Sequence, residues 1–358
     1  MRSQCLIILG FFAAAAALPA ADIPRTSSGH PDLSGTYDVA TRTPLARPKA
    51  LGTKRTLTDE EAQAIARKEA ELVAQADTAT NPDRDAPEEG GAGFSGEIAV
   101  PELDAAAGNV GGYNWFWIDR GSGAFKIDGQ WRTSIIVDPP NGRHPALTAQ
   151  GKSRAAARAK MYRPNTGQAW WLEAGLDPGP YDDPELRPLA ERCLLGFGST
   201  SGPPMLPVLY NNLKRIVQTE DNIMILAEMV HDARIVRMNA EHAPPDVRKW
   251  MGDSIGHWEG DTLVVDTTNF TDKPALGGAS RNLHVIERFR RVDADTIVYK
   301  FTVDDPTIWT ASWSGEYVWP TTDQRVYEYA CHEANYSFGG ILRGARVLET
   351  DIVKSDDD

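Results

Sequence analysis

The chain has 358 residues, a formal net charge of −13 at pH 7 and 41% hydrophobic residues. A strongly acidic chain without a basic run lacks the positive surface that binds nucleic acid, so we expect no nucleic-acid partner. The length is sufficient to bury a large hydrophobic core.

The N-terminus reads as a cleavable secretory signal, residues 1–21. Arg2 supplies a positive start, residues 5–17 form an apolar run, and residues 18–21 are a Pro- and Ala-containing exit. A membrane anchor, the alternative, needs roughly 20 apolar residues, and this run is shorter. No later segment is apolar enough to form a membrane span. We therefore expect an exported protein, periplasmic or extracellular.

Residues 22–100 are expected to form an extended segment with one helix. Residues 31–37 resemble a turn that leads into a short strand. Thr58 and Glu61 have the spacing of a capping box, and residues 59–76 are dense in Ala, Glu and Lys, which predicts a helix there. The Pro, Asp and Gly cluster at 81–93 predicts a linker or loop.

Residues 101–354 have the pattern of an antiparallel β domain, and an acidic tail follows at 355–358. Period-2 segments separated by Asp, Gly and Asn turns are typical of such domains. The predicted fold class is mainly β, a lipocalin-like antiparallel meander barrel or sandwich of about eight to ten strands, with a helical insertion at about 148–162. The strands are expected at 114–118, 130–137, 214–218, 223–230, 254–258, 262–270, 283–292, 296–304, 309–319 and 325–332.

After removal of the signal, Cys193 and Cys331 are the cysteines of the mature chain. In an oxidising compartment two cysteines are most simply one disulfide. The alternative is two buried free thiols. Neither cysteine has a neighbourhood that would make it a reactive thiolate.

Four phrases carry a resemblance: 31–36, 228–234, 256–263 and 329–336, which read PDLSGT, EMVHDAR, GHWEGDTL and YACHEANY. Together they resemble a family of uncharacterised secreted bacterial proteins, over most of the mature chain. The resemblance implies export but brings no activity and no catalytic residue. The hairpins are also loosely similar to lipocalin-type barrels, which is an analogy of fold alone.

Glu228 is the first candidate catalytic residue. Its predicted strand, 223–230, is apolar on both faces, so this carboxylate must be paired, have a raised pKa or face a cavity. A carboxylic acid with a raised pKa is a general acid or base. Because side chains alternate along a strand, Asp232 would lie on the same face as Glu228, and His231 would lie on the other face. The alternative is a salt bridge, with Arg234 or another arginine.

The predicted hairpin of 283–292 and 296–304 also places charged residues on an apolar face. A three-residue turn would place Val285, Glu287, Phe289 and Arg291 on the inward face, whereas a four-residue turn would place His284, Ile286, Arg288 and Arg290 there. Either register puts charge beside aromatic residues. We therefore expect a polar interior that binds a small ligand through Arg234 and Glu287; the alternative is a partly solvated edge strand.

Three histidines have an acidic residue close by: His231, His257 and His332. With Glu333 they complete the candidate catalytic set, and with Glu333 or Glu259 they would be the donors of a mononuclear metal site. None of the spacings matches a known ligand signature, so no metal ligand and no cofactor is assigned. The alternative is that these histidines cap turns or donate to backbone.

Two further patterns are weighed. Tyr113, Trp115 and Trp117 are candidate ligand-binding residues of an aromatic cavity, although alternating aromatic residues are more often core. Residues 252–256 read G-x-S-x-G around Ser254. That motif needs a strand before the serine and a helix after it, and here the order is reversed, so we read it as the entry to a strand.

These features favour a cofactor-free acid–base enzyme, a lyase, hydratase, isomerase or hydrolase, acting on a small aromatic or carbohydrate-like compound. The alternatives are a non-catalytic periplasmic small-molecule binding protein and an envelope assembly factor. Export removes the chain from cytoplasmic NAD(P)H and ATP. The oligomeric state is not predicted.

Overall fold

The computed structural model describes residues 23–76, 118–163, 167–333 and 335–356. The largest element of the structure is a 10-stranded sheet with the strand order β1-β6-β7-β8-β9-β10-β11-β12-β13-β5. Its strands are β1 (Gly35–Asp38), β5 (Ile136–Asp138), β6 (Leu213–Gln218), β7 (Asn222–Ala227), β8 (Ala233–Met238), β9 (Asp253–Glu259), β10 (Thr262–Thr268), β11 (His284–Arg291), β12 (Thr296–Asp304) and β13 (Trp313–Pro320). The fold is therefore mainly β.

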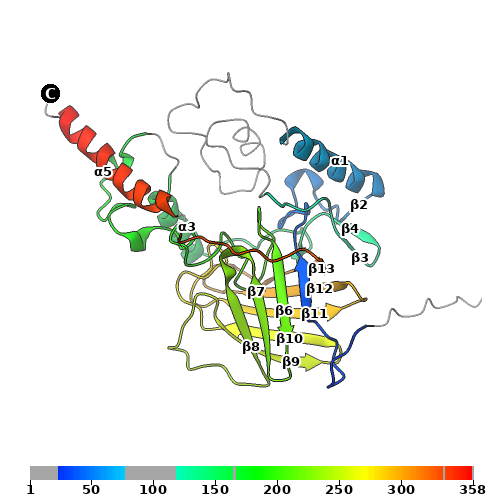
Figure 1. Cartoon of the computed structure of the whole chain (residues 1–358). Helices are drawn as coiled ribbons and strands as arrows, with labels where there is room; N and C mark the ends of the chain where they lie inside the picture. Colours follow the sequence, from blue (N-terminus) through cyan, green and yellow to red (C-terminus); the bar gives the residue numbers. More distant parts are fainter. Residues whose placement is uncertain (1–22, 77–117, 164–166, 334, 357–358) are drawn as a thin grey trace, which may run out of the picture.

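The sheet curls until its first strand meets the end of β13 (Figure 1). Tyr37 of β1 forms a bridge with Thr321, and the amide of Thr322 donates to the carbonyl of Thr36 at 2.9 Å. These contacts give the sheet the shape of a barrel in which inward and outward side chains alternate along each strand.

Pairing is antiparallel between all neighbours except β8 and β9, which run parallel. The expectation of a purely antiparallel meander is therefore wrong at this point. A parallel pair requires a crossover connection, and residues 239–252 supply it. The three predicted hairpins, β6–β7, β9–β10 and β11–β12, are confirmed.

A second sheet and the helices lie outside the curled sheet. Strands β2 (Thr56–Leu57), β4 (Gln130–Arg132) and β3 (Lys126–Ile127) form a small antiparallel sheet in that order. The helices are α1 (Asp59–Ala76), α3 (Ala149–Met161), α4 (Trp170–Glu173) and α5 (Tyr336–Asp356), with 3-10 turns at Lys49–Leu51, Pro184–Leu186 and Met229–His231.

The helix starts follow from local capping. The Thr58 amide donates to Glu61 Oε2 at 2.8 Å, and the Glu61 amide donates to Thr58 Oγ1 at 3.2 Å, which is the capping box expected from the sequence. Thr148 caps α3 by accepting the Gly151 amide at 3.0 Å.

The C-terminal part of the chain differs from the prediction. Residues 325–330 have no regular secondary structure and 331–333 form a turn, so the strand expected at 325–332 is wrong. Helix α5 then begins at Tyr336 and extends to Asp356, into the expected acidic tail. Its Ala345 and Leu348 pack against Trp170 and Trp171, and Trp171 Nε1 donates to Glu349 at 2.7 Å.

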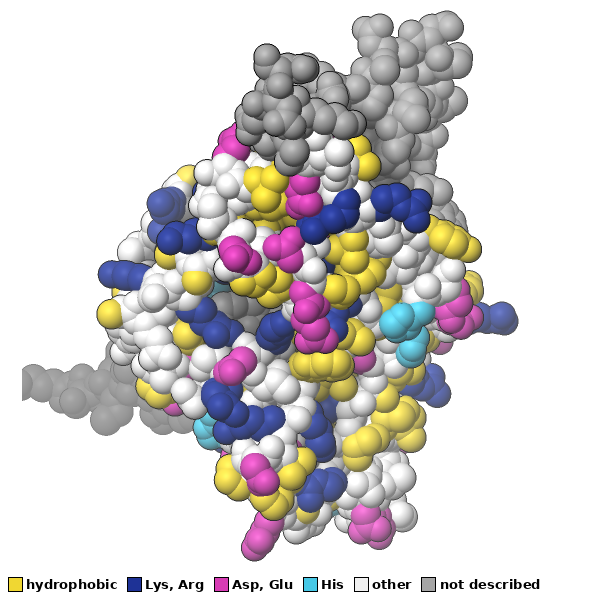
Figure 2. Space-filling view, turned by 90° about the vertical axis from the view of Figure 1, so that its left-hand side faces the viewer, with side chains coloured by type: hydrophobic (Ala, Val, Ile, Leu, Met, Phe, Trp, Pro, Cys, Tyr) yellow, Lys and Arg dark blue, Asp and Glu magenta, His cyan; other side chains and the backbone are white. Residues whose placement is uncertain are grey.

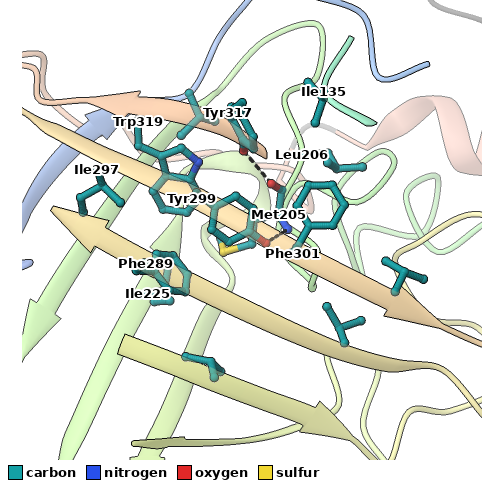
Figure 3. Packing of buried hydrophobic residues seen from close by; sticks show 14 of the residues in the cluster. Ile135, Met205, Leu206, Ile225, Phe289, Ile297, Tyr299, Phe301, Tyr317 and Trp319 are labelled. Atoms are coloured by element: carbon teal, nitrogen blue, oxygen red, sulfur yellow. Dashed lines mark hydrogen bonds between the residues drawn. The ribbon is translucent and has the colours of Figure 1, made fainter. Parts of the chain in front are cut away.

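Aromatic side chains fill the inward face of the barrel. Tyr299 and Tyr317 point toward a loop that enters from the side, and their hydroxyls meet the amide and the carbonyl of Met205 at 2.9 and 2.6 Å (Figure 3). Every residue from 199 to 206 on this loop is buried. Among the described residues, the aromatic side chains that are 0% exposed are Tyr37, Phe270, Phe289, Tyr299, Trp313, Tyr317 and Trp319.

Within the described residues, no helix is both long and apolar enough to cross a membrane. The signal segment, residues 1–21, lies outside the described residues.

Candidate active site

Arg234 and Glu287, two of the predicted ligand-binding residues, are paired with each other inside the barrel. The β11–β12 turn has three residues, because Arg291 pairs with Ile297, so Glu287 faces inward as one of the two registers predicted. Its carboxylate accepts both terminal nitrogens of Arg234, at 2.5 and 2.9 Å, and the Tyr299 hydroxyl at 2.8 Å. The carboxylate holds the pKa of Arg234 above its usual value despite burial. The pair is thus neutralised internally.

The predicted histidines are not brought together. His257 is exposed on β9, 3.3 Å from Glu259. His332 and Glu333 are exposed beside the cystine, and His231 is exposed in the turn after β7. Within the described residues, no group of three or more His, Cys, Asp or Glu side chains is arranged to hold a metal ion.

The aromatic cavity and the G-x-S-x-G sequence are the two remaining predictions. Tyr113, Trp115 and Trp117 lie outside the described residues. Ser254 lies on β9, buried, with its hydroxyl 2.9 Å from that of Thr267. This position inside a strand agrees with our reading of the G-x-S-x-G sequence as a strand entry.

Lys214 is the most unusual charged residue of the barrel. It lies near the start of β6, paired with Ala227 of β7 and Tyr37 of β1, and its side chain is completely buried. The ammonium nitrogen donates to Thr200 Oγ1 at 2.9 Å. Within the described part of the chain it has no carboxylate in ion-pair contact. Burial lowers its pKa to about 7, against the raising effect of Glu228, Asp232 and Asp38.

Three carboxylates, Glu228, Asp232 and Asp38, act on this amine at longer range, and Asp119 interacts with Asp38 and Glu228. Burial raises the pKa of Asp119 to about 6, aided by the charges of Asp38 and Glu228. Burial also raises the pKa of Asp38, although the Ala40 amide and Lys214 oppose it. The pKa of Asp232 rises for the same reason, against the Ser201 hydroxyl, His231 and the Gly196 amide.

Separate elements position these groups. Asp38 ends β1, and the Asp119 carboxylate accepts the Gly121 amide at 3.2 Å. The Asn212 side chain, fully buried, donates to the Asp119 carbonyl at 2.6 Å and ties this segment to β6. The buried loop at 199–206 supplies Thr200. The cluster therefore forms where three strands end and two loops meet.

Glu228 and Asp232 reach the cluster through a strained turn. The predicted strand ends early, at Ala227, and Glu228 begins a 3-10 turn. Val230 and His231 both have left-handed backbone, with φ of 58° and 46°. Left-handed φ is costly for a β-branched residue and is concentrated at functional sites. Asp232 and Glu228 both act on Lys214 through their charge, while His231 is exposed. Their positions follow from this turn and not from strand alternation.

Residues 321–333 cover Glu228 from outside. The Tyr327 amide donates to Glu228 Oε1 at 3.1 Å, and the Tyr329 ring stacks on that of Tyr210. Cys331 is bonded to Cys193, with a Cα–Cα distance of 5.7 Å, as the sequence predicted. The disulfide holds this segment to the loop that leads to Thr200.

A second polar network lies on the outside of the barrel. His242 bridges two carboxylates, with Nδ1 3.2 Å from Asp253 and Nε2 3.2 Å from Asp266. His284 Nε2 is 2.9 Å from the same Asp266 oxygen. The hydrogen bond to Asp266 raises the pKa of His284 despite partial burial, and the pKa of Asp266 is lowered because its histidine contacts outweigh burial.

Sequence reasoning did not single out Lys214, Asp38, Asp119 or Thr200. One signal was available for Lys214: it stands two residues before the buried Ile216, and period 2 places both on one face. Comparison of the chain with family models, with curated proteins and with solved structures gave no match.

Proposed function

We propose that the protein is a cofactor-free acid–base enzyme whose catalytic centre is the buried cluster around Lys214. Its substrate would be a small organic compound, aromatic or carbohydrate-like. The observation that carries the proposal is the completely buried Lys214 amine, which meets a threonine hydroxyl and lacks an ion-paired carboxylate in the described residues.

The chemistry follows from the protonation states. With a pKa of about 7, Lys214 is partly neutral at physiological pH and its lone pair accepts a proton from substrate. Asp119, with a pKa of about 6, and Asp232, whose pKa is also raised, retain a proton more readily than exposed carboxylic acids and serve as donors. Lyase, hydratase, isomerase and hydrolase reactions all use such an acid and base.

Thr200 positions the amine. The hydrogen bond of 2.9 Å fixes the Lys214 nitrogen in the low-dielectric interior, where proton transfer requires little solvent reorganisation. Because Lys214 and Thr200 are completely buried, substrate must displace a covering segment. The loop before Thr200 carries the exposed Phe197 and Gly198 and is the segment we assign to this opening.

Export to an oxidising compartment is part of the proposal. The Cys193–Cys331 disulfide supports it, because such bonds persist in secreted and periplasmic proteins. The apolar N-terminal sequence supports it independently.

The test is a screen for proton transfer. The full chain is incubated with small aromatic acids, hydroxy acids and sugars in D₂O, and deuterium incorporation and product formation are followed by NMR. We expect turnover by the natural protein, and a loss of about 10²- to 10⁴-fold in Lys214→Met, the effect of removing a general base. Lys300→Met, at a half-exposed lysine of β12, is the matched control and should retain full rate.

Two results would go against the proposal. Equal turnover by Lys214→Met and the natural protein would remove the lysine from the reaction. A compound that binds stoichiometrically but is never converted would favour the alternative, a periplasmic binding protein.

A further inference from the structure

A groove of about 720 Å³ lies on the outer face of the curled sheet. Gly35 and Thr36 of β1, Arg215 of β6 and Leu226 of β7 line one side, and residues 321–326 line the other. Arg215 follows Lys214 in β6, and neighbouring residues of a strand point to opposite faces. The groove is therefore separate from the cluster around Lys214. Its volume lies in the range of about 300–1,000 Å³ that is typical of small-molecule sites.

Two guanidinium groups line this groove. Arg215 NH1 donates to Thr36 Oγ1 at 2.8 Å, which orients the side chain along the groove. Neither Arg215 nor Arg325 forms an ion pair with a carboxylate in the part of the chain that the structure describes. Asp323 is the acidic member of the lining, so two positive charges face one negative charge. This local excess of positive charge stands out on a chain whose net charge is −13.

Apolar side chains continue from the groove over the outer sheet. Leu226 and Val326 belong to the lining. Next to them, Met224 pairs with Val217 on one side and with Ile235 on the other. Val217 and Ile235 are 41% and 49% exposed, so three neighbouring strands present apolar groups to solvent. A contiguous exposed apolar surface of this kind marks a binding surface more often than an isolated side chain does.

On the face that Figure 2 presents, basic and acidic side chains are mixed, with hydrophobic groups between them. A guanidinium without an ion-pair partner beside an apolar surface favours a ligand with an anionic group and an apolar part. Its planar N–H groups bind carboxylate, sulfonate or phosphate oxygens in pairs. The apolar surface next to it accepts the hydrocarbon part of the same molecule.

We propose that this groove binds a small organic anion, a carboxylate or sulfonate attached to an apolar body. Arg215 and Arg325 receive the anionic group, and Leu226 and Val326 contact the apolar body. Thr36 holds Arg215 in the binding orientation. Asp323 opposes binding by charge repulsion and sets the affinity below its maximum.

The test compares two fluorescent probes that differ in one group. 1-Anilinonaphthalene-8-sulfonate carries the anion, and N-phenyl-1-naphthylamine is the neutral compound without it. Binding of each to the full chain is titrated by fluorescence at low ionic strength, where exposed charges are least screened. We expect the anionic probe to bind with one site per chain and the neutral probe more weakly.

Point variants test whether the anionic probe binds in this groove. Arg215→Ala and Arg325→Ala are each expected to weaken the anionic probe about tenfold, the usual effect of losing a hydrogen bond to a charged group, and to leave the neutral probe within about twofold. Asp323→Asn should tighten the anionic probe. Arg290→Ala, at an exposed arginine of β11 outside the groove, is the matched control and should change neither.

The proposal is overturned if both arginine variants bind the anionic probe as the natural protein does, or if Arg290→Ala weakens it equally. It is also overturned if the neutral probe binds as tightly as the anionic one. Because Arg215 and Arg325 are exposed, circular dichroism should show unchanged folding in both variants. None of these measurements depends on the reaction proposed for Lys214.

Discussion

Two groups of buried charged residues lie inside the same barrel, and their charges are compensated in different ways. The Arg234 and Glu287 side chains form a bidentate pair, supported by Tyr299, and each neutralises the other. Lys214 is equally buried, yet its hydrogen bond goes to the Thr200 hydroxyl, and the carboxylates act on it from a distance.

The difference distinguishes a charge pair with a structural role from an amine with a chemical role. A buried pair whose opposite charges are in direct contact holds strands together. A buried amine without a paired counter-ion changes its protonation state near neutral pH, which is a property of catalytic lysines. The left-handed backbone at Val230 and His231 occurs beside the second cluster.

The largest effect should come from releasing the segment that covers the Lys214 cluster. Cys193 and Cys331 are 138 residues apart, and in the chain-entropy model a disulfide closing such a loop contributes about 5 kcal/mol. The Cys193→Ser/Cys331→Ser double variant should lose stability of this order in urea unfolding. An unchanged unfolding midpoint would show that the disulfide does not restrain the unfolded chain.

The second-largest loss of stability should come from breaking the Arg234–Glu287 pair. Glu287→Ala leaves Arg234 buried without a counter-ion, and we expect a loss of about 3–5 kcal/mol. The double variant Arg234→Met/Glu287→Leu removes both charges and should recover most of that loss. If Glu287→Ala unfolds with the stability of the natural protein, the pair is not a structural element of the barrel.

The smallest effect is expected outside the barrel, at His284. Its pKa is raised by Asp266, so the histidine contributes stability below its unfolded pKa, near 6.5, and this contribution disappears as pH rises through the higher folded pKa. The pKa of Asp266 is lowered, so its contribution disappears as pH falls below its usual range. His284→Gln should therefore lose about 0.3–1 kcal/mol at pH 6 and less at pH 8. Equal losses at both pH values would contradict this.

The repeated local patterns made much of the fold predictable. Short Asp and Gly turns between alternating segments predicted three hairpins, and the three-residue turn at 293–295 placed Glu287 inward. Helix α5 was missed because Gly339, Gly340 and Gly344 lower helix propensity. It is stabilised by packing on Trp170 and Trp171, a contact over a long sequence separation that no local pattern contains.

The candidate site was only partly predictable. Glu228 was recognisable because a carboxylate in an apolar segment must be compensated. Its partners Asp38, Asp119 and Lys214 come from distant segments that meet only when β1 pairs with β6. Lys214 itself was obscured because β6 has apolar side chains on both faces, Ile216 on one and Leu213 and Val217 on the other, so alternation alone did not say which face is buried.

The most direct test is the titration of Lys214 in the folded protein. Lysine side chains are labelled with ¹³C at Cε, the Lys214 signal is assigned as the one missing from Lys214→Arg, and its chemical shift is followed from pH 5 to pH 11. The account predicts a midpoint near pH 7 for Lys214, well below the value of about 10.4 that is usual for a lysine side chain. A Lys214 midpoint at or above pH 10 would mean that the amine is paired and charged, and it would contradict the acid–base function proposed for this cluster.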